Sequence, residues 1–208
     1  MFTIFLVDDD AGVLKALSRL LRASRYEVRS FASALEFLAC HDAAVPGCAV
    51  LDVALPDLDG LALQQTLTVE GSHRPVVFIT GQGDIPTSVR AMKAGAIDFL
   101  TKPVSDQDLL DAIARAQEQD AQARRTHAEL ASILAKITTL TPREREVLTH
   151  VITGRLNKQI AGDLGTVEKT IKVHRGRVME KLGVRTVADL VRLADKAGIS
   201  RLAPNGDV

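Results

Sequence analysis

The sequence predicts an α/β domain built on a five-stranded parallel sheet, followed by a helical linker and an all-α domain of four helices. Three observations predict this organisation. Short apolar runs alternate with helical patterns over the first hundred residues, which is typical of a parallel sheet covered by helices on both faces. Neither proline nor glycine occurs between Pro103 and Pro142. From Thr141 onward, every pattern is helical.

Five runs rich in valine, isoleucine and phenylalanine are the expected strands. They are Phe2–Val7, Glu27–Phe31, Cys48–Leu51, Val76–Thr80 and Ile97–Leu100. Between the first two runs, the apolar residues follow the i, i+3/i+4, i+7 spacing of an amphipathic helix. These residues are Val13, Leu14, Leu17, Leu20 and Leu21.

A long helix, or two abutting helices, is expected between Pro103 and Pro142. Apolar residues begin and end this segment, whereas its middle is mostly alanine, glutamine and charged residues. The middle has little to bury, so we interpret it as a bridge between two domains. A short coiled-coil dimer seam is the alternative, although fewer than three full heptads of apolar residues are visible in the segment. The predicted ranges are 1–118 for the first domain, 119–138 for the linker and 139–208 for the second domain.

Helix signals recur at short intervals in the last third of the chain. Thr141-Pro142-Arg143-Glu144 has the pattern of a capping box with proline at the first helical position. Later helices are expected at about Lys158–Leu164, up to Leu182, and from about Thr186. Short helices that meet at glycines are typical of a helix-turn-helix arrangement.

The net charge of zero conceals an uneven distribution. Residues 1–104 carry nine Lys and Arg against twelve Asp and Glu, residues 105–140 four against six, and residues 141–208 thirteen against eight. A basic C-terminal segment is typical of a module that meets nucleic acid. The apolar run at the N-terminus is too short to span a membrane and is followed by acids instead of a cleavage site. We therefore expect a cytoplasmic protein with no membrane partner.

The ends of the predicted strands carry polar side chains. Asp8 and Asp9 follow the first strand, Asp52 follows the third, Thr80 ends the fourth, and Lys102 follows the fifth. The carboxyl ends of parallel strands meet at one edge of a sheet, so these groups should lie together. Carboxylates that close repel one another unless a hard cation is present, which predicts Mg²⁺ or Mn²⁺. The sequence therefore predicts a metal-assisted phosphoryl-transfer site.

The chemistry suggests a role for each group. Asp52 stands alone at the end of a central apolar strand, so it is the expected nucleophile that forms an acyl phosphate. Asp8 and Asp9 would hold the metal with Asp52 and the backbone carbonyl of Ala54. Lys102 would neutralise one phosphoryl oxygen, and the Thr80 hydroxyl would hydrogen-bond another.

Five motifs resemble the receiver domains of response regulators. They are Val7-Asp8-Asp9-Asp10, Leu51-Asp52 with Pro56 and Gly60, Phe78-Ile79-Thr80-Gly81, the run from Met92 to Leu100, and Lys102-Pro103. The resemblance covers about residues 1–120 and implies a flavodoxin-like sheet of strand order 2-1-3-4-5. It also implies a cis Lys102–Pro103 peptide bond, a switch pair of Thr80 and Phe99, and a sensor histidine kinase as the phosphoryl donor.

The same resemblance implies a surface for dimerisation. In many receivers the pairing face lies on the fourth helix and fifth strand, and a homodimer forms on phosphorylation. The corresponding residues are Val89, Arg90, Lys93, Ala94 and Asp98. The sequence departs from the family pattern at Ala54 and Leu55, because such receivers often carry Arg and Met after the phosphoacceptor.

The helix that ends at Leu182 has an apolar and a polar side. Ile171, Val178 and Leu182 share the apolar side, and the opposite side gathers Lys169, Val173, Gly176, Arg177 and Glu180. An exposed valine suits contact with a thymine methyl group, and Lys172 can reach a guanine edge or a phosphate. A solvated, charged helix is the alternative.

The stretch from Leu140 to Val184 is similar to the LuxR-type helix-turn-helix. The motifs that carry this similarity are Leu140-Thr141-Pro142-Arg143-Glu144, Asn157-Lys158-Gln159-Ile160-Ala161, Lys169-Thr170-Ile171-Lys172-Val173-His174 and Glu180-Lys181-Leu182-Gly183-Val184. Together with the receiver motifs, they resemble the FixJ/NarL class of transcription regulators.

This similarity implies roles for residues at the DNA interface. Lys172 and Val173 would touch bases, while Asn157, Lys158, Thr170 and His174 would mostly meet phosphates; Lys169 and Arg177 share the same face. The sequence departs from the pattern at Gly176, where a larger residue is common. Val167 also departs, because Ser or Thr usually caps the recognition helix there, so the cap either shifts to Thr166 or is lost.

Together the motifs predict a DNA-binding transcription regulator, not an enzyme. Asp52 would accept a phosphoryl group, the protein would dimerise, and promoter binding would change. Activation of transcription, with RNA polymerase as a partner, is the expected outcome. Two alternatives of other classes stay open. One is a phosphatase-like enzyme that turns over phosphoesters at Asp52, and the other is a scaffold that works without phosphorylation.

Overall fold

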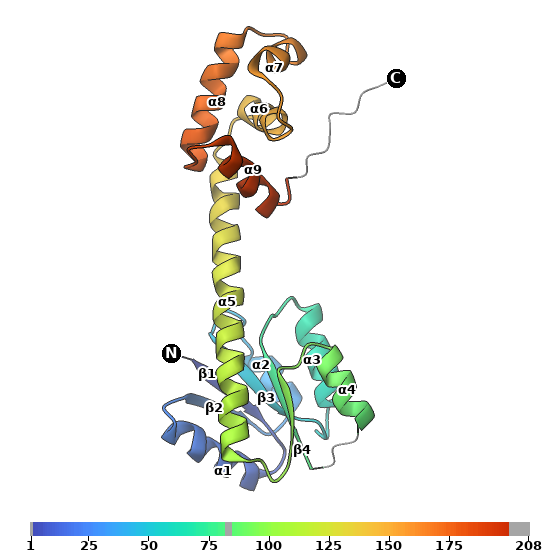
Figure 1. Ribbon diagram of the computed structural model, residues 1–208. Helices are drawn as coiled ribbons and strands as arrows, with labels where there is room; N and C mark the ends of the chain where they lie inside the picture. The colour runs from blue at the N-terminus through green and yellow to red at the C-terminus, as the bar shows by residue number, and fades with distance from the viewer. Residues whose placement is uncertain (1, 82–84, 200–208) are drawn as a thin grey trace. The chain divides into compact units, whose positions relative to one another are not determined.

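The chain forms two compact units, Met1–Arg124 and Arg125–Val208, in a computed structural model that describes residues 2–81 and 85–199. The first unit contains a five-stranded parallel sheet (Figure 1). Its strands are β1 (Thr3–Val7), β2 (Glu27–Phe31), β3 (Gly47–Asp52), β4 (Val76–Thr80) and β5 (Asp98–Thr101). The strand order is β2-β1-β3-β4-β5, which confirms the predicted sheet.

Helices cover both faces of this sheet, and the strand side chains alternate between two cores. Ile4 and Leu6 pack with α1 (Ala11–Ala23) and the first part of α5 (Asp106–Thr138). Phe5 and Val7 pack with α2 (Ala34–Cys40), α3 (Gly60–Val69) and α4 (Ile85–Lys93). Because β1, β3 and β4 are buried on both faces, they appear in the sequence as continuous apolar runs instead of alternating ones.

The helix α5 is continuous, so of the two predicted possibilities the single long helix is correct. Its middle is attached to the first unit by Arg124, whose guanidinium donates hydrogen bonds to the carbonyl oxygens of Ala43, Ala44 and Val45 at 2.8–3.0 Å. Arg124 also pairs with Asp120 on the same helix at 2.8 Å. The α2–β3 loop is thereby fixed to α5.

The second unit consists of α6 (Pro142–Ile152), α7 (Asn157–Asp163), α8 (Glu168–Leu182) and α9 (Val187–Lys196) around one apolar core. The Thr141 hydroxyl accepts a hydrogen bond from the Glu144 amide, and the Glu144 carboxylate accepts one from the Thr141 amide. The predicted capping box is therefore present. Gly183, with φ of 70°, ends α8 in the left-handed conformation that glycine adopts without strain.

Candidate functional site

The carboxyl ends of the parallel strands bring the predicted polar groups together at one rim of the sheet. The register pairs Val7 with Leu51, so Asp8 and Asp52 follow at the same level on neighbouring strands. Thr80 ends β4 opposite Thr101 of β5, and Lys102 comes next. Asp8, Asp52 and Thr80 are buried, whereas Lys102 is half-buried.

Lys102 joins the two buried carboxylates directly. Its Nζ lies 2.7 Å from Asp8 Oδ2 and 2.6 Å from Asp52 Oδ2. The second oxygen of each carboxylate accepts a backbone amide, from Asp10 at 2.9 Å and from Ala54 at 3.1 Å. The Lys102–Pro103 peptide bond is cis, as the resemblance implied. The predicted cluster of Asp8, Asp52 and Lys102 is therefore assembled in the folded chain.

The electrostatics of the rim favour a cation. Burial raises the pKa of Asp8, although the hydrogen bonds from Lys102 and from the Asp10 amide act to lower it. Burial acts to lower the pKa of Lys102, but its hydrogen bonds to Asp52 and Asp8 outweigh that effect, so the pKa is raised. Lys102 therefore stays charged at neutral pH, while the desolvation of Asp8 is only partly offset by its hydrogen bonds.

Asp8, Asp9 and Asp52 form a set of oxygen donors that fits a divalent cation. Each can offer one carboxylate oxygen, and the three oxygens lie within 4.8 Å of one another. Hard oxygen ligands on a site that is open on one side suit Mg²⁺, which keeps several of its own waters. Asp9 and Ala54 are exposed, so the cluster can be reached from solvent.

The loop after β3 is held by contacts that sequence reasoning did not find. Asp57 accepts the amides of Ala34 and Leu35 at the start of α2, at 3.2 and 2.8 Å. Gly60 packs so closely that an added Cβ would lie 2.4 Å from the carbonyl oxygen of Asp52. The motif predicted Gly60, but no periodicity in the sequence links Asp57 to α2.

The residues of the predicted switch and dimer face lie on β4, α4 and β5. The rings of Phe78 and Phe99 are 6.2 Å apart and tilted by 47°, and Phe99 is half-buried. On and just after α4, Val89, Arg90, Lys93 and Ala94 are exposed, while Asp98 is half-buried and pairs with Arg115 of α5. Ile85, which no sequence motif included, and Met92, which begins the fourth motif, add two exposed apolar side chains to α4.

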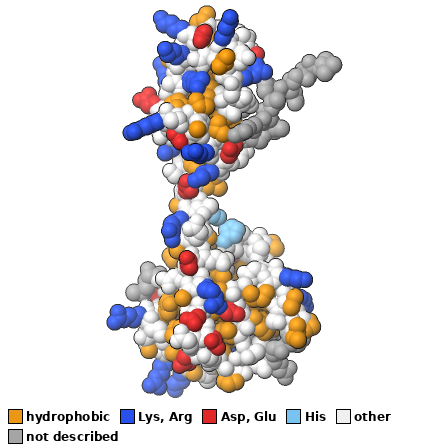
Figure 2. Space-filling view, viewed as in Figure 1, with side chains coloured by type: hydrophobic (Ala, Val, Ile, Leu, Met, Phe, Trp, Pro, Cys, Tyr) orange, Lys and Arg blue, Asp and Glu red, His pale blue; other side chains and the backbone are white. Residues whose placement is uncertain are grey.

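The predicted polarity of α8 is confirmed by burial. Ile171, Val178 and Leu182 are buried, whereas Val173 is 48% exposed. Lys158, Lys169, Lys172 and Arg177 are also exposed, and Asn157, Thr170 and His174 are half-buried. Figure 2 shows several Lys and Arg side chains on the visible face of this unit.

Both predicted departures have structural counterparts. Val167 is the N-cap of α8 and provides no side-chain hydrogen bond, so the cap is lost and has not shifted to Thr166. A Cβ added at Gly176 would meet nothing within 4 Å, which leaves open space on the polar side of α8. Sequence reasoning missed Arg175, whose guanidinium donates a 3.1 Å hydrogen bond to Asn157 and so connects α8 to α7.

Comparison with protein families matches residues 4–114 to the response regulator receiver domain and residues 138–194 to the LuxR family of bacterial regulatory proteins. The chain is 46% identical over 197 residues to Nodulation protein W of Bradyrhizobium diazoefficiens, covering 95% of this chain and 87% of that protein. It is 39% identical over 196 residues to the transcriptional regulatory protein FixJ of the same organism, covering 94% and 96%.

Solved structures give the same result. The response regulator StyR is similar with a TM-score of 0.83 and 46% identity, covering 93% of this chain and 98% of that one. Full-length FixJ from B. japonicum is similar with a TM-score of 0.58 and 38% identity, covering 96% and 98%. Within residues 2–81 and 85–199, no helix combines the length and apolar character needed to cross a membrane.

Proposed function

Because the chain belongs to the response regulators that join a receiver domain to a LuxR-type DNA-binding domain, we propose that phosphorylation of Asp52 controls its binding to promoter DNA. The receiver domain implies a histidine kinase as the phosphoryl donor, and the LuxR-type domain implies promoter DNA as a partner. Its relatives are transcription regulators and not enzymes. We propose the ranges 1–118, 119–138 and 139–208 for receiver, linker and DNA-binding domain.

The contact of Lys102 with both Asp8 and Asp52 is the observation that carries the proposal. The Asp52 carboxylate attacks phosphorus, an Asp52 Oδ–P bond forms, and the bond between phosphorus and the donor nitrogen breaks. Lys102 neutralises an oxygen of the transferred group. The Asp8 side chain is 0% exposed, whereas the Asp52 side chain is 7% exposed and Ala54, two residues further on, is exposed, which supports Asp52 as the residue that a donor reaches.

The acidic cluster would hold Mg²⁺ or Mn²⁺. Receiver domains generally bind Mg²⁺ at such a cluster, and we propose Asp8, Asp9, Asp52 and the Ala54 carbonyl as its ligands here. When bound, the cation neutralises the charge that develops on the phosphoryl oxygens. Lys102 Nζ and the Ala54 amide each hold one oxygen of the Asp52 carboxylate and so orient it.

Phosphorylation would be transmitted through β4 and β5. We propose that the Thr80 hydroxyl donates to a phosphoryl oxygen and that Phe99 reorients with it. The face formed by α4 and β5 would then pair with a second copy. Its proposed residues are Val89, Arg90, Lys93, Ala94 and Asp98.

The DNA-binding unit would read a promoter with α8. The exposed Lys172 and Val173 are proposed to contact bases. Residues proposed to meet phosphates or flank them are Asn157, Lys158, Lys169, Thr170, His174 and Arg177. RNA polymerase is the proposed further partner, with activation of transcription as the result.

Intact-mass measurement with acetyl phosphate tests the phosphoacceptor. One added phosphoryl group is expected in Mg²⁺, and none in Asp52→Asn or in excess EDTA. Asp111→Asn, which removes an exposed carboxylate on α5, serves as the matched control and should be phosphorylated normally. Phosphorylation that persists in Asp52→Asn would refute the assignment.

Titrations on operator and scrambled DNA at two salt concentrations test the interface. Lys172→Ala and Val173→Ala should weaken operator binding selectively, because a good base contact contributes about 1–3 kcal/mol of discrimination. Lys158→Ala should weaken both DNAs alike and lower the salt slope by about one unit. Unchanged operator binding by Gly176→Glu would show that this side of α8 does not enter the groove.

A further inference from the structure

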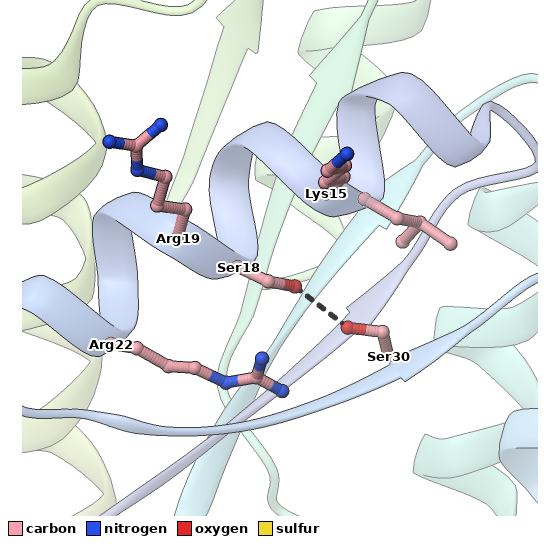
Figure 3. Close-up of a pocket in the computed structure, with 6 residues that line it drawn as sticks. Lys15, Ser18, Arg19, Arg22 and Ser30 are labelled. Carbon is pink, nitrogen blue, oxygen red and sulfur yellow. Dashed lines mark hydrogen bonds between the residues drawn. The ribbon is translucent and has the colours of Figure 1, made fainter.

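A groove of about 520 Å³ lies between α1 and the edge strand β2 (Figure 3). Its lining residues are Leu14, Lys15, Ser18, Arg19, Arg22 and Ser30. A second, apolar groove along α1 reaches Lys102 through Val13, Ala16, Leu17 and Leu20. The groove at β2 is lined by no residue of the acidic rim and by none of the second groove, so it is a separate site.

Three cations line the groove without a carboxylate to balance them. Lys15, Arg19 and Arg22 follow one another at i, i+4 and i+7, which places them along one side of α1. None of the three forms an ion pair with any residue that the structure describes. Like charges at this spacing destabilise a helix unless something neutralises them.

Among the described residues that line the groove, none is acidic. Glu27 is the acid on β2, but it is already bonded to Arg29 and to the Thr3 hydroxyl. Residues 1–104 as a whole carry more acids than bases, so the three cations at the groove differ in sign from the net charge of the domain. A local cationic patch in an acidic domain indicates a site for a small anion.

Two hydroxyls at the groove complete a set of hydrogen-bond donors. Ser18 Oγ and Ser30 Oγ lie 2.9 Å apart, and Ser18 is only 6% exposed. One hydroxyl proton is used between them, so the other O–H remains to donate to a ligand. Arg22 donates a 3.2 Å hydrogen bond to the carbonyl oxygen of Val28, which holds its guanidinium beside β2, as Figure 3 shows.

We propose that this groove binds a soluble small molecule that carries two or more phosphate groups. Guanidinium groups pair with phosphate oxygens through parallel N–H donors, and an ammonium adds a point charge. The volume falls in the range of small-molecule pockets, about 300–1,000 Å³. Three cations are few for a nucleic acid, whose proteins typically neutralise about 6–10 phosphates.

Titration of the ¹⁵N-labelled full chain with inorganic pyrophosphate, in metal-free buffer, tests the proposal by NMR. The amide signals of Ser18 and Ser30 and the side-chain Nε signal of Arg22 should shift along one binding curve. These signals report on the groove alone, so anion binding elsewhere on the chain does not confuse the result.

Variants of the lining residues should weaken this binding. Arg22→Gln and Lys15→Gln should each raise the Kd followed at Ser30 by about tenfold, since each removes one charge-assisted contact. Arg29→Gln is the matched control and should leave the Kd unchanged. Arg29 is the neighbour of Ser30 on β2, but its guanidinium lies 5.8 Å from the Phe5 ring centre on the other face of the sheet.

Three results would overturn the proposal. The first is that the amide signals of Ser18 and Ser30 do not shift with pyrophosphate. The second is that Arg22→Gln and Arg29→Gln bind pyrophosphate with equal Kd values. The third is that the protein sediments with anionic phospholipid vesicles but does not respond to pyrophosphate. The last result would assign the patch to a membrane surface. Phosphorylation of Asp52 needs none of the groove residues, so either proposal can fail while the other stands.

Discussion

Replacing Lys102 by Met tests how strongly the acidic rim depends on the lysine bonded within it. The change removes Nζ from between two carboxylates whose side chains are 0% and 7% exposed, while it keeps a long apolar stem. Breaking a buried ion pair costs about 3–5 kcal/mol. The Lys102 side chain is 21% exposed, so solvent screens part of the interaction, and we expect a loss of about 2–4 kcal/mol of unfolding free energy.

For a domain of this size, a loss of 1 kcal/mol lowers the Tm by about 4 °C. In EDTA, the Tm of the first unit should therefore be about 8–16 °C lower in Lys102→Met than in the unchanged chain. Mg²⁺ should restore much of this loss, because a ligand at a hundred times its Kd stabilises by about 2.7 kcal/mol. The unchanged chain should gain less, since Lys102 already offsets part of the negative charge of Asp8 and Asp52.

The pH dependence has a definite sign. Burial already raises the pKa of Asp8 above the usual value of 3.8 for aspartate, and loss of the Lys102 hydrogen bond, which acts to lower that pKa, should raise it further. A raised pKa in the folded state means that stability is present at low pH and is lost as the pH rises through that pKa. The Tm deficit of Lys102→Met should therefore be smaller at pH 4 than at pH 7.

Thermal unfolding of Lys102→Met and of Lys93→Met, with EDTA or Mg²⁺ at both pH values, is the measurement. Lys93 is exposed on α4 and makes the second variant a matched control for the loss of a lysine. Equal Tm values for the two variants in EDTA, or a deficit that Mg²⁺ does not reduce, would refute this account of the rim.

Three further substitutions give distinct outcomes. Gly60→Ala should lower the unfolding free energy of the first unit by about 1–3 kcal/mol, and with it the urea midpoint, because its Cβ would lie 2.4 Å from the Asp52 carbonyl oxygen. An unchanged midpoint would show that the loop yields. Gly176→Ala, which meets nothing within 4 Å, should instead stabilise the DNA-free second unit by up to about 1 kcal/mol in denaturant titrations. The hydrogen bond from Lys181, and after it the bond from the Thr141 amide, lowers the pKa of Glu144 below its usual value of 4.5. The stability that this carboxylate contributes is present above that pH and is lost as the pH falls through the lowered pKa. Acid titration followed by circular dichroism should show that Glu144→Gln loses this part of the acid dependence.

The rim could be predicted because parallel strands bring their carboxyl ends together. An acid or a lysine placed directly after an apolar run therefore has a position that the sheet topology already defines. Asp8, Asp52 and Lys102 are separated by 44 to 94 positions along the chain, and yet the strand pattern alone brings them to one edge. The stripe of Ile171, Val178 and Leu182 was predictable for a similar reason, because helical spacing fixes which side is buried.

Single hydrogen bonds between distant parts of the chain could not be predicted in this way. Asp57 reaches α2 and Arg175 reaches Asn157 through single contacts that leave no period in the sequence. The lost cap at Val167 could be predicted in part. The motif identified the position, but only the geometry of the α8 N-terminus decided between a shifted cap and none.

The bonds of Arg124 to the α2–β3 loop have a practical consequence for dissecting the molecule. A fragment cut at residue 118 would lose both Arg124 and Asp120, and the loop carbonyls of residues 43–45 would lose the donors that α5 provides. A chimera that fuses this receiver to a foreign output module should therefore keep the native helix through Arg124. Hydrogen exchange at Ala44 and Val45 would report whether the graft has preserved that attachment.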